Sequence, residues 1–430
     1  MNKAFRNTIR DFFNDQALII FMILVPLFYP LLYAWIYNNE TIQDVPVVVV
    51  DADQSSRSRD FVRRLDATEG VRVVGQVSAL DEADRLISQG EVRGVVLFPA
   101  DFAAQLARQE QAHVSVMVDA SGMLYYKAVL TAATDVSLAM NADIKVERAH
   151  NMTQREDAIT QHPLRYEQIA LFNPQGGFSS FLIPAVLILV IHQTLLLGIG
   201  MEAGTRRERM ERTQRFPTTE EFTLDDKAAM LERQTERKAT QIAQSLTERP
   251  STSGDRHPRQ PRAHHASRRA WRQLLGRAAA FTLIYVPVAC YCLLVVPRLF
   301  SLPTMGDVWS ILLFATPFLL AVVFLGITIG HFARQRESIV LIVVFSSMPL
   351  LFLSGVSWPG TAFPWYWKTL SYFLPSTFGV NGFVRLSSMG ATLAEVQPEY
   401  IALWIQVVGY GLTAWWVTRR NELRKIALRG

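Results

Sequence analysis

Cysteine and charged residues are both scarce in this sequence. Its two cysteines, Cys290 and Cys292, lie in one apolar run, which excludes a disulfide framework, a CxxC redox pair and a cysteine zinc site. Charged residues make up 19% of the chain against 50% hydrophobic residues, and they are missing from six long runs. At about 150 residues per domain the length suggests roughly three soluble domains. The clustering of the apolar residues instead excludes a soluble enzyme with a single core.

Catalytic and nucleotide-binding motifs are missing as well. No GxxxxGK[ST] loop occurs, so we expect that the chain does not hydrolyse ATP by itself and holds no cofactor. The absence of HExxH, of GxSxG and of paired intramembrane aspartates argues against an intramembrane enzyme. The apolar runs also lack the Asp, Glu, Lys and Arg that proton or sodium coupling usually needs. A transport function would therefore draw its energy from another subunit.

The six apolar runs predict six transmembrane helices, because each can cross a hydrocarbon core of about 30 Å. They are residues 17–37, 178–201, 278–297, 308–333, 338–357 and 400–418. The first run is longer than the core of a usual signal peptide, and no small-residue cleavage site follows it.

Lysine and arginine are distributed unequally between the two sides of these spans. One side collects 27 of the 43 basic residues, whereas the short loops on the other side carry only Arg298, Lys368 and Arg385. The long segment after the first span is exempt, since large domains are translocated largely regardless of charge. We therefore predict that both termini and the loop 202–277 are cytoplasmic.

Residues 38–177 have the pattern of an inserted domain. Strand-like runs at 45–50, 71–77, 92–98 and 113–119 alternate with helix-like runs at 54–67, 79–89 and 100–109. Strict alternation favours a parallel sheet with helical crossovers, and an Ala-rich pattern predicts one long helix from Met123 to about Arg155. The predicted fold class is an α-helical polytopic membrane protein with six transmembrane helices and an inserted α/β extracytoplasmic domain.

Four polar residues follow the first strand of this domain: Asp51, Asp53, Ser55 and Ser56. They could form a metal or phosphate site at the carboxyl end of the strand. Asp and Ser are also the residues that a helix N-cap uses, and we favour capping. The domain contains 20 acidic and 13 basic residues, which is typical of a solvated acidic surface.

The amino-acid composition of the loop 202–277 changes along its length. Glu202 and Arg206 are four residues apart, as are Glu208 and Arg212, so its first part is expected to form a polar helix against the membrane surface or a partner. Residues 249–269 are rich in Pro, Ser, Arg and His and are expected to be disordered. The histidines of this tract have no cysteine or acidic neighbour at ligand spacing, so we expect no metal site.

Two further segments are predicted to lie at the membrane surface. Residues 358–397 are rich in aromatic residues and broken by prolines, which predicts short re-entrant or interfacial helices that either anchor the chain or cap the outer end of a path. Residues 1–16 carry apolar side chains at helical spacing among basic ones, which predicts an interfacial amphipathic helix. Residues 398–430 combine the last span with a basic tail.

Strongly polar residues inside the spans are few. They are His192, Gln193, His331 and Gln406. Each could line a path, but a lone His or Gln in a span more often bonds to a neighbouring helix.

Taken in order along nearly the whole chain, five motifs make the sequence similar to a known family. It resembles the permease subunit of type-2 ABC exporters, in the branch with a large extracytoplasmic domain between the first two spans. The motifs are VPVVVVDADQSS (45–56), LFNPQGGFSSFLIPAV (171–186), GMEAGTRRER (200–209), LSGVSWP (353–359) and FLPSTFGVNGFVR (373–385).

The resemblance implies several partners. The chain would pair with a second permease, either another copy or a paralogue, and with two copies of a separate ABC ATPase that binds ATP and Mg. It would export an amphiphile, such as a drug or a lipid, across the bacterial inner membrane, in contact with membrane lipid. Whether a periplasmic adaptor and an outer-membrane duct complete the route stays open, and no nucleic acid is expected.

The resemblance also implies functional residues. In the family the charged segment after the second span is a coupling helix that docks on the ATPase, and the path lies at the dimer interface. The implied ATPase-coupling residues are Glu202, Arg206, Arg207, Glu208 and Arg212. The implied path residues are Phe181, His192, Phe345, Met348 and Phe352. The loop 202–277 departs from the family, because it is longer than the compact loop found there.

An alternative from another class is a membrane receptor or scaffold. Its extracytoplasmic domain would bind a ligand and its cytoplasmic loop would signal. Six spans fit this alternative less well, since a receptor needs only one or two crossings.

Overall fold

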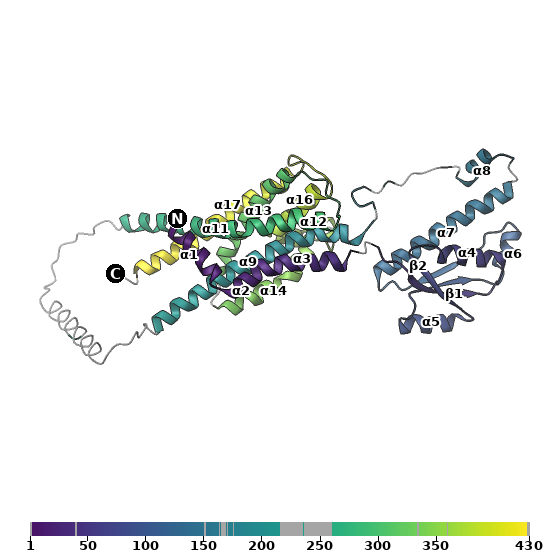
Figure 1. Cartoon of the computed structure of the whole chain (residues 1–430), viewed down its shortest axis with the longest axis horizontal. Helices are drawn as coiled ribbons and strands as arrows, with labels where there is room; N and C mark the ends of the chain where they lie inside the picture. Colours follow the sequence, from purple (N-terminus) through teal and green to yellow (C-terminus); the bar gives the residue numbers. More distant parts are fainter. Residues whose placement is uncertain are drawn as a thin grey trace. The chain divides into compact units, whose positions relative to one another are not determined.

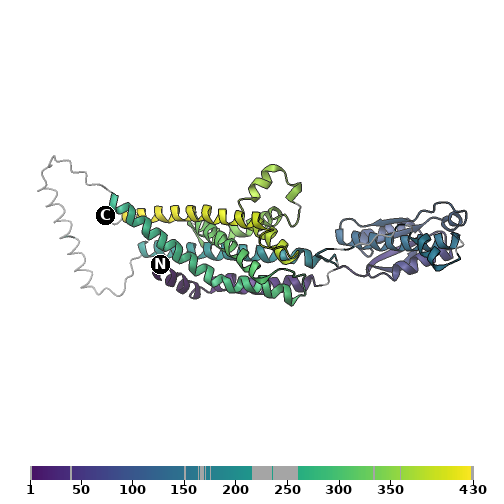
Figure 2. The ribbon, with the colours of Figure 1, turned by 90° about the horizontal axis from the view of Figure 1, so that it is seen from above.

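The computed structural model describes residues 2–38, 41–149, 152–162, 164, 169, 171–174, 176–215, 235, 260–332, 335–358 and 360–427. It forms two compact units: Tyr37–Ser179 is one, and Met1–Ile36 together with Ser180–Gly430 is the other. Figure 1 labels their helices and strands, and Figure 2 gives a second view of the same ribbon. We call them the α/β unit and the helical unit.

The α/β unit is built on a small mixed sheet. Its elements are β1 (Val45–Asp51), α4 (Ser56–Asp66), β2 (Val71–Val77), α5 (Leu80–Gln89), β3 (Gly94–Phe98), α6 (Phe102–Ala107), β4 (Ser115–Val118), α7 (Met123–Ala149) and α8 (Gln154–Gln161). The strand order is β2-β1-β3-β4. β1 is parallel to both of its neighbours, whereas β4 is antiparallel to β3.

The antiparallel β4 corrects the prediction of an all-parallel sheet. A parallel connection needs a crossover that carries the chain back along the full length of the strands. The helix between β3 and β4, α6, has only 6 residues, or about 9 Å of length. α6 is too short to carry the chain back along the strands. β4 therefore starts at the edge of the sheet where β3 ends, and it runs antiparallel to β3.

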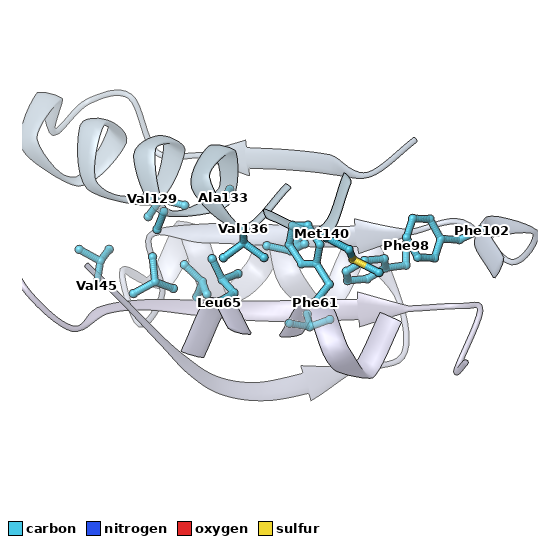
Figure 3. Close-up of a cluster of buried hydrophobic side chains, with 14 residues drawn as sticks. Val45, Phe61, Leu65, Phe98, Phe102, Val129, Ala133, Val136 and Met140 are labelled. Carbon is cyan, nitrogen blue, oxygen red and sulfur yellow. The ribbon is translucent and has the colours of Figure 1, made fainter. Parts of the chain in front are cut away.

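Both faces of β1 are buried, as its continuous valine run predicts. Val45, Val47 and Val49 pack with side chains of α4 and α7 into the larger core, which Figure 3 shows in close-up. Val48 and Val50 point to the opposite face, where a smaller core includes Ala83 of α5. The alternation of strand side chains thus divides one valine run between two cores.

The turn after β1 is held by capping, which confirms the favoured interpretation of its polar residues. Asp51 Oδ1 accepts hydrogen bonds from the backbone N–H groups of Asp53 and Gln54, at 3.1 and 2.9 Å. Ser55 is the N-cap of α4, and its hydroxyl accepts from Ser58 N at 3.1 Å. Among the described residues of the chain there is no group of His, Cys, Asp and Glu that could hold a metal.

The long helix α7 ends earlier than expected. It was predicted to reach about Arg155 but stops at Ala149, and a separate helix, α8, begins at Gln154. The reason for the new start is a capping box, in which Thr153 and Glu156 satisfy each other's backbone N–H groups.

Among its described residues, the helical unit contains six helices that are long and apolar enough to cross a membrane. Around them lie α1 (Asn2–Phe13), η3 (Gly360–Ala362), α15 (Trp365–Ser371) and α16 (Pro375–Ser387). The six are α2-η1-α3 (Gln16–Ile19, Ile20–Leu24, Val25–Ile36), α9 (Phe178–Arg215), α11-η2-α12 (Gln260–Cys290, Tyr291–Val295, Val296–Leu299), α13 (Val308–Phe332), α14 (Arg336–Leu353) and α17 (Gln397–Ala427). They agree with the six predicted spans.

The start of α11 corrects a prediction. Residues 249–269 were expected to be disordered, but 260–269 are the first turns of α11, while 249–259 lie outside the described residues. Ala266 and Ala270 are fully buried, and α11 packs against α1. The small side chains allow this close contact, so the helix continues well beyond the apolar run.

The six apolar helices differ in the fraction of their residues that is buried by other parts of the helical unit. In α9, 89% of the apolar window is buried, whereas the corresponding figure for α14 is 22%. α9 is therefore the central helix of the unit, and α14 lies at its periphery.

Candidate functional site: a charged helix junction

The predicted coupling residues lie where α9 meets four other helices. α9 leaves its apolar stretch at Met201 and continues through GMEAGTRRER to Arg215 without interruption. At this level it meets α1, α11 near Arg277, the end of α13 and the first turn of α14. We call this region the charged junction.

Glycine makes the closest contact at the charged junction possible. A Cβ atom on Gly204 would lie 2.9 Å from Cα of Arg336, the first residue of α14. A Cβ on Gly330, near the end of α13, would lie 2.8 Å from the Cβ of Ala203. The backbones of α9, α13 and α14 can approach this closely only because these positions have no side chain.

Glu202 is buried in the charged junction, with 3% of its surface exposed. Its Oε2 accepts a hydrogen bond of 2.6 Å from Arg277 of α11, which is also buried. Nη2 of Arg206 lies 2.8 Å from the other carboxylate oxygen, as the four-residue spacing predicts. A buried carboxylate needs such partners to offset the loss of water, so the Glu202 side chain joins α9 to α11 inside the unit.

A second ionic group joins the starts of α2 and α14 to α9. Asp15 caps α2 by accepting from Ala17 N at 3.1 Å, and its two oxygens also accept hydrogen bonds of 3.1 and 3.0 Å from the Arg336 guanidinium. Nη1 of Arg336 lies 3.4 Å from Thr205 Oγ1 of α9. Oε1 of Glu208, also on α9, accepts from the backbone N–H of Arg336 at 3.1 Å.

The other predicted coupling residues have varied surroundings. Arg207 donates a hydrogen bond of 2.8 Å to the carbonyl oxygen of His331 in α13. The next residues of α9 are more exposed: the Arg209 side chain is 59% exposed and Met210 is 45% exposed. Arg212 lies further along α9, but its side chain is outside the part that the structure describes.

Sequence reasoning missed half of the charged junction: Asp11, Asp15, Arg277 and Arg336. The carboxylate of Asp11 lies 3.8 Å from Arg206 and 3.7 Å from Arg209. One signal was available in the sequence. Each of the four lies just beyond the end of an apolar run, on the side predicted to be cytoplasmic, where charges from different spans are expected at one level.

The structure separates the predicted path residues into two groups. Phe345, Met348 and Phe352 lie on one face of α14, with 76%, 65% and 54% of their surfaces exposed, and Phe181 of α9 is 53% exposed. His192 is buried at 1% exposure, its ring 6.5 Å from that of Phe318 in α13. No described residue hydrogen-bonds to either of its ring nitrogens.

Two other polar residues of the spans bond to neighbouring backbone. Nδ1 of His331 lies 2.8 Å from the carbonyl oxygen of Ile327, one turn earlier in α13. Gln406 of α17 donates a hydrogen bond of 2.8 Å to the carbonyl oxygen of Tyr372, in the segment between α15 and α16. The contact of Gln406 is the helix-bonding role that is common for such residues in spans.

An apolar groove of about 730 Å³ runs along the first span. It is lined by residues of that span between Leu24 and Trp35, together with Phe300. Trp35 itself is 73% exposed. Exposed aromatic side chains on a membrane-spanning helix are suited to contact with lipid or with another apolar helix.

Comparison with known proteins identifies the class. Residues 17–218 and 264–416 match the family described as "ABC-2 family transporter protein". The chain therefore belongs to the ABC-2 family of transport permeases, whose members normally work with a separate ATPase subunit. Residues 219–263 lie between the two matched stretches, in the loop that was already recognised as longer than in the family.

Curated relatives agree with this class. The chain is 28% identical over 97 residues to the "Inner membrane transport permease YadH" of Escherichia coli K12, and equally to the proteins of that name in E. coli O157:H7 and Shigella flexneri. The match spans 38% of the length of these relatives and 23% of this chain. Together with the six apolar helices, it supports a multi-pass membrane protein.

Proposed function

We propose that the chain is the permease subunit of an ATP-driven exporter, powered by a separate ATPase that docks on the exposed end of α9. The observation that carries this proposal is the continuity of α9. One helix of 38 residues runs from the most buried apolar stretch of the unit into a charged segment that contacts α1, α11, α13 and α14. A force on its end would reach all of them.

The orientation follows from charge. The two termini, the loop 202–277 and the segment before α14 together carry 27 of the 43 lysine and arginine residues, so this end of the unit would face the cytoplasm. A cytoplasmic ATPase would then meet the end of α9. The α/β unit, between the first two spans, would lie on the extracytoplasmic side.

The contacts divide the predicted coupling residues by role. Glu202, Arg206, Arg207 and Glu208 contact other parts of the helical unit, so they would transmit a displacement. Arg209, Met210 and the following residues of α9, including Arg212, would form the surface that the ATPase touches. Replacing Arg206 or Arg207 would therefore disturb the charged junction as well as docking. Arg209 also lies 3.7 Å from Asp11, but its side chain is 59% exposed, so its replacement should disturb the junction less.

The experiment is capture of the ATPase by the tagged chain in mild detergent, with mass spectrometry of the bound proteins. The wild type should retain a Walker-motif ATPase and a second permease. Arg209→Glu combined with Glu211→Arg should reduce ATPase capture about tenfold, as expected when roughly 1.4 kcal/mol of charge complementarity is lost. Membrane insertion should be unchanged.

A matched control is Arg272→Glu on α11, an exposed arginine that makes no described contact with α9. It reverses the same charge near the same end and should leave ATPase capture unchanged. Equal loss in both variants would contradict docking on α9. A wild-type chain that retains no ATPase would favour the alternative, a receptor or scaffold.

The substrate class follows from the exposed apolar surfaces. The α14 face and the first-span groove are apolar and aromatic, with the groove offering about 730 Å³. An amphiphilic substrate or a lipid would fit such surfaces, and a second permease would cover part of them. Retained lipid or substrate in the mass spectrum of the purified complex is the corresponding measurement.

A further inference from the structure

The first turn of α14 has an unusual source of capping. A helix N-terminus leaves four backbone N–H groups without intrahelical partners, and a side chain just before the helix usually satisfies one of them. Gln335, the residue before α14, makes no side-chain cap among the described contacts. The carboxylate of Glu208 instead accepts from Arg336 N at 3.1 Å. α14 is thus capped by a side chain of α9.

The same residue of α14 carries a second attachment. The Arg336 guanidinium forms two hydrogen bonds with Asp15, and the side chain of Arg336 is 24% exposed against 11% for Asp15. Two parallel bonds fix direction as well as distance. Because Asp15 is also the N-cap of α2, the bond joins α14 to the start of the first span.

These attachments matter because only a small part of α14 is covered by its own unit. Only 22% of its apolar window is buried, and its exposed side chains are apolar along most of its length. In a membrane such a surface gains nothing by packing on its own unit rather than on lipid. The first turn of α14 packs closely on Gly200 and Gly204 of α9, and the ionic contacts at Arg336 add the directed bonds that fix its position there.

We propose that Asp15, Arg336 and Glu208 are positioning residues that make α14 and the first span follow α9. The Glu208 cap ties the start of α14 to α9, and the Asp15–Arg336 pair ties it to the first span. This inference rests on the proposed function, since it assigns how a displacement of α9 by the ATPase reaches the spans with the exposed path residues.

The test follows the accessibility of α14 in the complex of the chain with its captured ATPase. Cys290→Ala and Cys292→Ala remove the native thiols, and Val344→Cys, at a position 58% exposed on α14, supplies one reporter. The rate of maleimide labelling is measured with and without ATP and vanadate. We expect the nucleotide to change the wild-type rate, and Asp15→Asn or Arg336→Gln to reduce that change about tenfold.

The variants are chosen to separate coupling from folding. Asparagine is as good an N-cap as aspartate, so Asp15→Asn keeps the cap of α2 and removes the charge together with one of the two acceptors for Arg336. Arg336→Lys retains the charge but not the paired geometry, and it should give an intermediate response. Neither Asp15 nor Arg336 is placed on the docking surface, so ATPase capture should stay within about twofold of wild type.

Two controls match the design. Arg57→Gln breaks an arginine–carboxylate pair of the same kind, with two bonds, between Arg57 and Glu147 in the α/β unit, and should leave the response at position 344 intact. Val408→Cys on α17, at 60% exposure, reports a helix without a contact to Arg336 in the described structure. Its response should be the same in Asp15→Asn as in the wild type.

The outcomes are distinct. A wild-type nucleotide response in both Asp15→Asn and Arg336→Gln, with ATPase captured, overturns the inference and leaves the proposed function standing. If both variants are labelled faster than the wild type with and without nucleotide, and also melt at a lower temperature, the contacts are purely structural. That result also overturns the inference. Failure of the wild type to capture any ATPase removes the proposed function itself.

Discussion

The α/β unit and the helical unit both bury apolar side chains, but they differ in where their ion pairs lie and in how much apolar surface they expose. In the α/β unit Val47 and Phe98 are fully buried, and its ion pairs lie at the surface. The helical unit buries Glu202 and leaves Phe345 76% exposed. The difference shows that burial of apolar surface from water builds the first unit. Small residues and ionic contacts fix the helices of the second, whose apolar surfaces have no water to avoid.

The largest effect should come from breaking the buried ion pair of the helical unit. Glu202→Ala leaves Arg277 buried without its carboxylate, which should lower the free energy of unfolding by about 3–5 kcal/mol. The measurement is the melting temperature of the detergent-purified protein. The double variant Glu202→Ala/Arg277→Met should recover most of the loss, because no buried charge then stays unpaired, whereas Arg206 is partly exposed. If Glu202→Ala is as stable as the wild type, buried ionic contacts do not fix the helices of the helical unit.

A similar loss is expected in the α/β unit from an apolar change. Phe98→Ala opens a cavity between Phe61 and Phe102, both of which contact its ring edge-on, and should cost about 3–4 kcal/mol. Hydrogen exchange of β1 amides, followed by mass spectrometry in the intact protein, reports this loss. Leu138→Ala, at a position 53% exposed on α7, is the control and should change exchange little.

Close helix packing predicts a smaller effect. Gly204→Ala places a methyl group 2.9 Å from the backbone of Arg336, which must shift, so we expect a loss of about 1–3 kcal/mol in stability. Gly409→Ala on α17 is the matched control, since its methyl group would meet nothing within 4 Å. That substitution should be neutral or slightly stabilising through helix propensity. Equal melting temperatures for the two variants would refute the close contact.

The smallest effect concerns local structure in the α/β unit. Ser55→Ala removes the N-cap of α4 and should destabilise the unit by about 1 kcal/mol. The measurement is hydrogen exchange of the backbone amides in the first turn of α4. Ser55→Asp retains an acceptor at the cap and should restore the protection of these amides. If they stay protected in Ser55→Ala, the cap is dispensable.

Much of the fold is predictable because its signals are local. The apolar run 308–333 differs by one residue from α13 (Val308–Phe332), and the valine run of β1 is buried on both faces as expected. The predictions that were wrong concern features set by the length of a connecting segment or by contact with a distant helix. Six residues of α6 set the direction of β4, and contact with α1 extends α11 back to Gln260.

The charged junction was predictable only in part. The Glu202–Arg206 pair follows from helical spacing within one segment. The contacts of Glu202 with Arg277 and of Asp15 with Arg336 join residues 75 and 321 positions apart. Periodicity carries no information on such pairs, because they depend on how the helices pack against one another.

The unbroken length of α9 has a mechanical consequence. Its 38 residues extend about 57 Å, nearly twice the thickness of a bilayer's hydrocarbon core. The part beyond Met201 is a rigid lever of about 20 Å, so a tilt of about 10° moves its tip by about 3.5 Å. A small rotation of a bound motor domain would thus be delivered to the helix core as torque rather than absorbed by a flexible link.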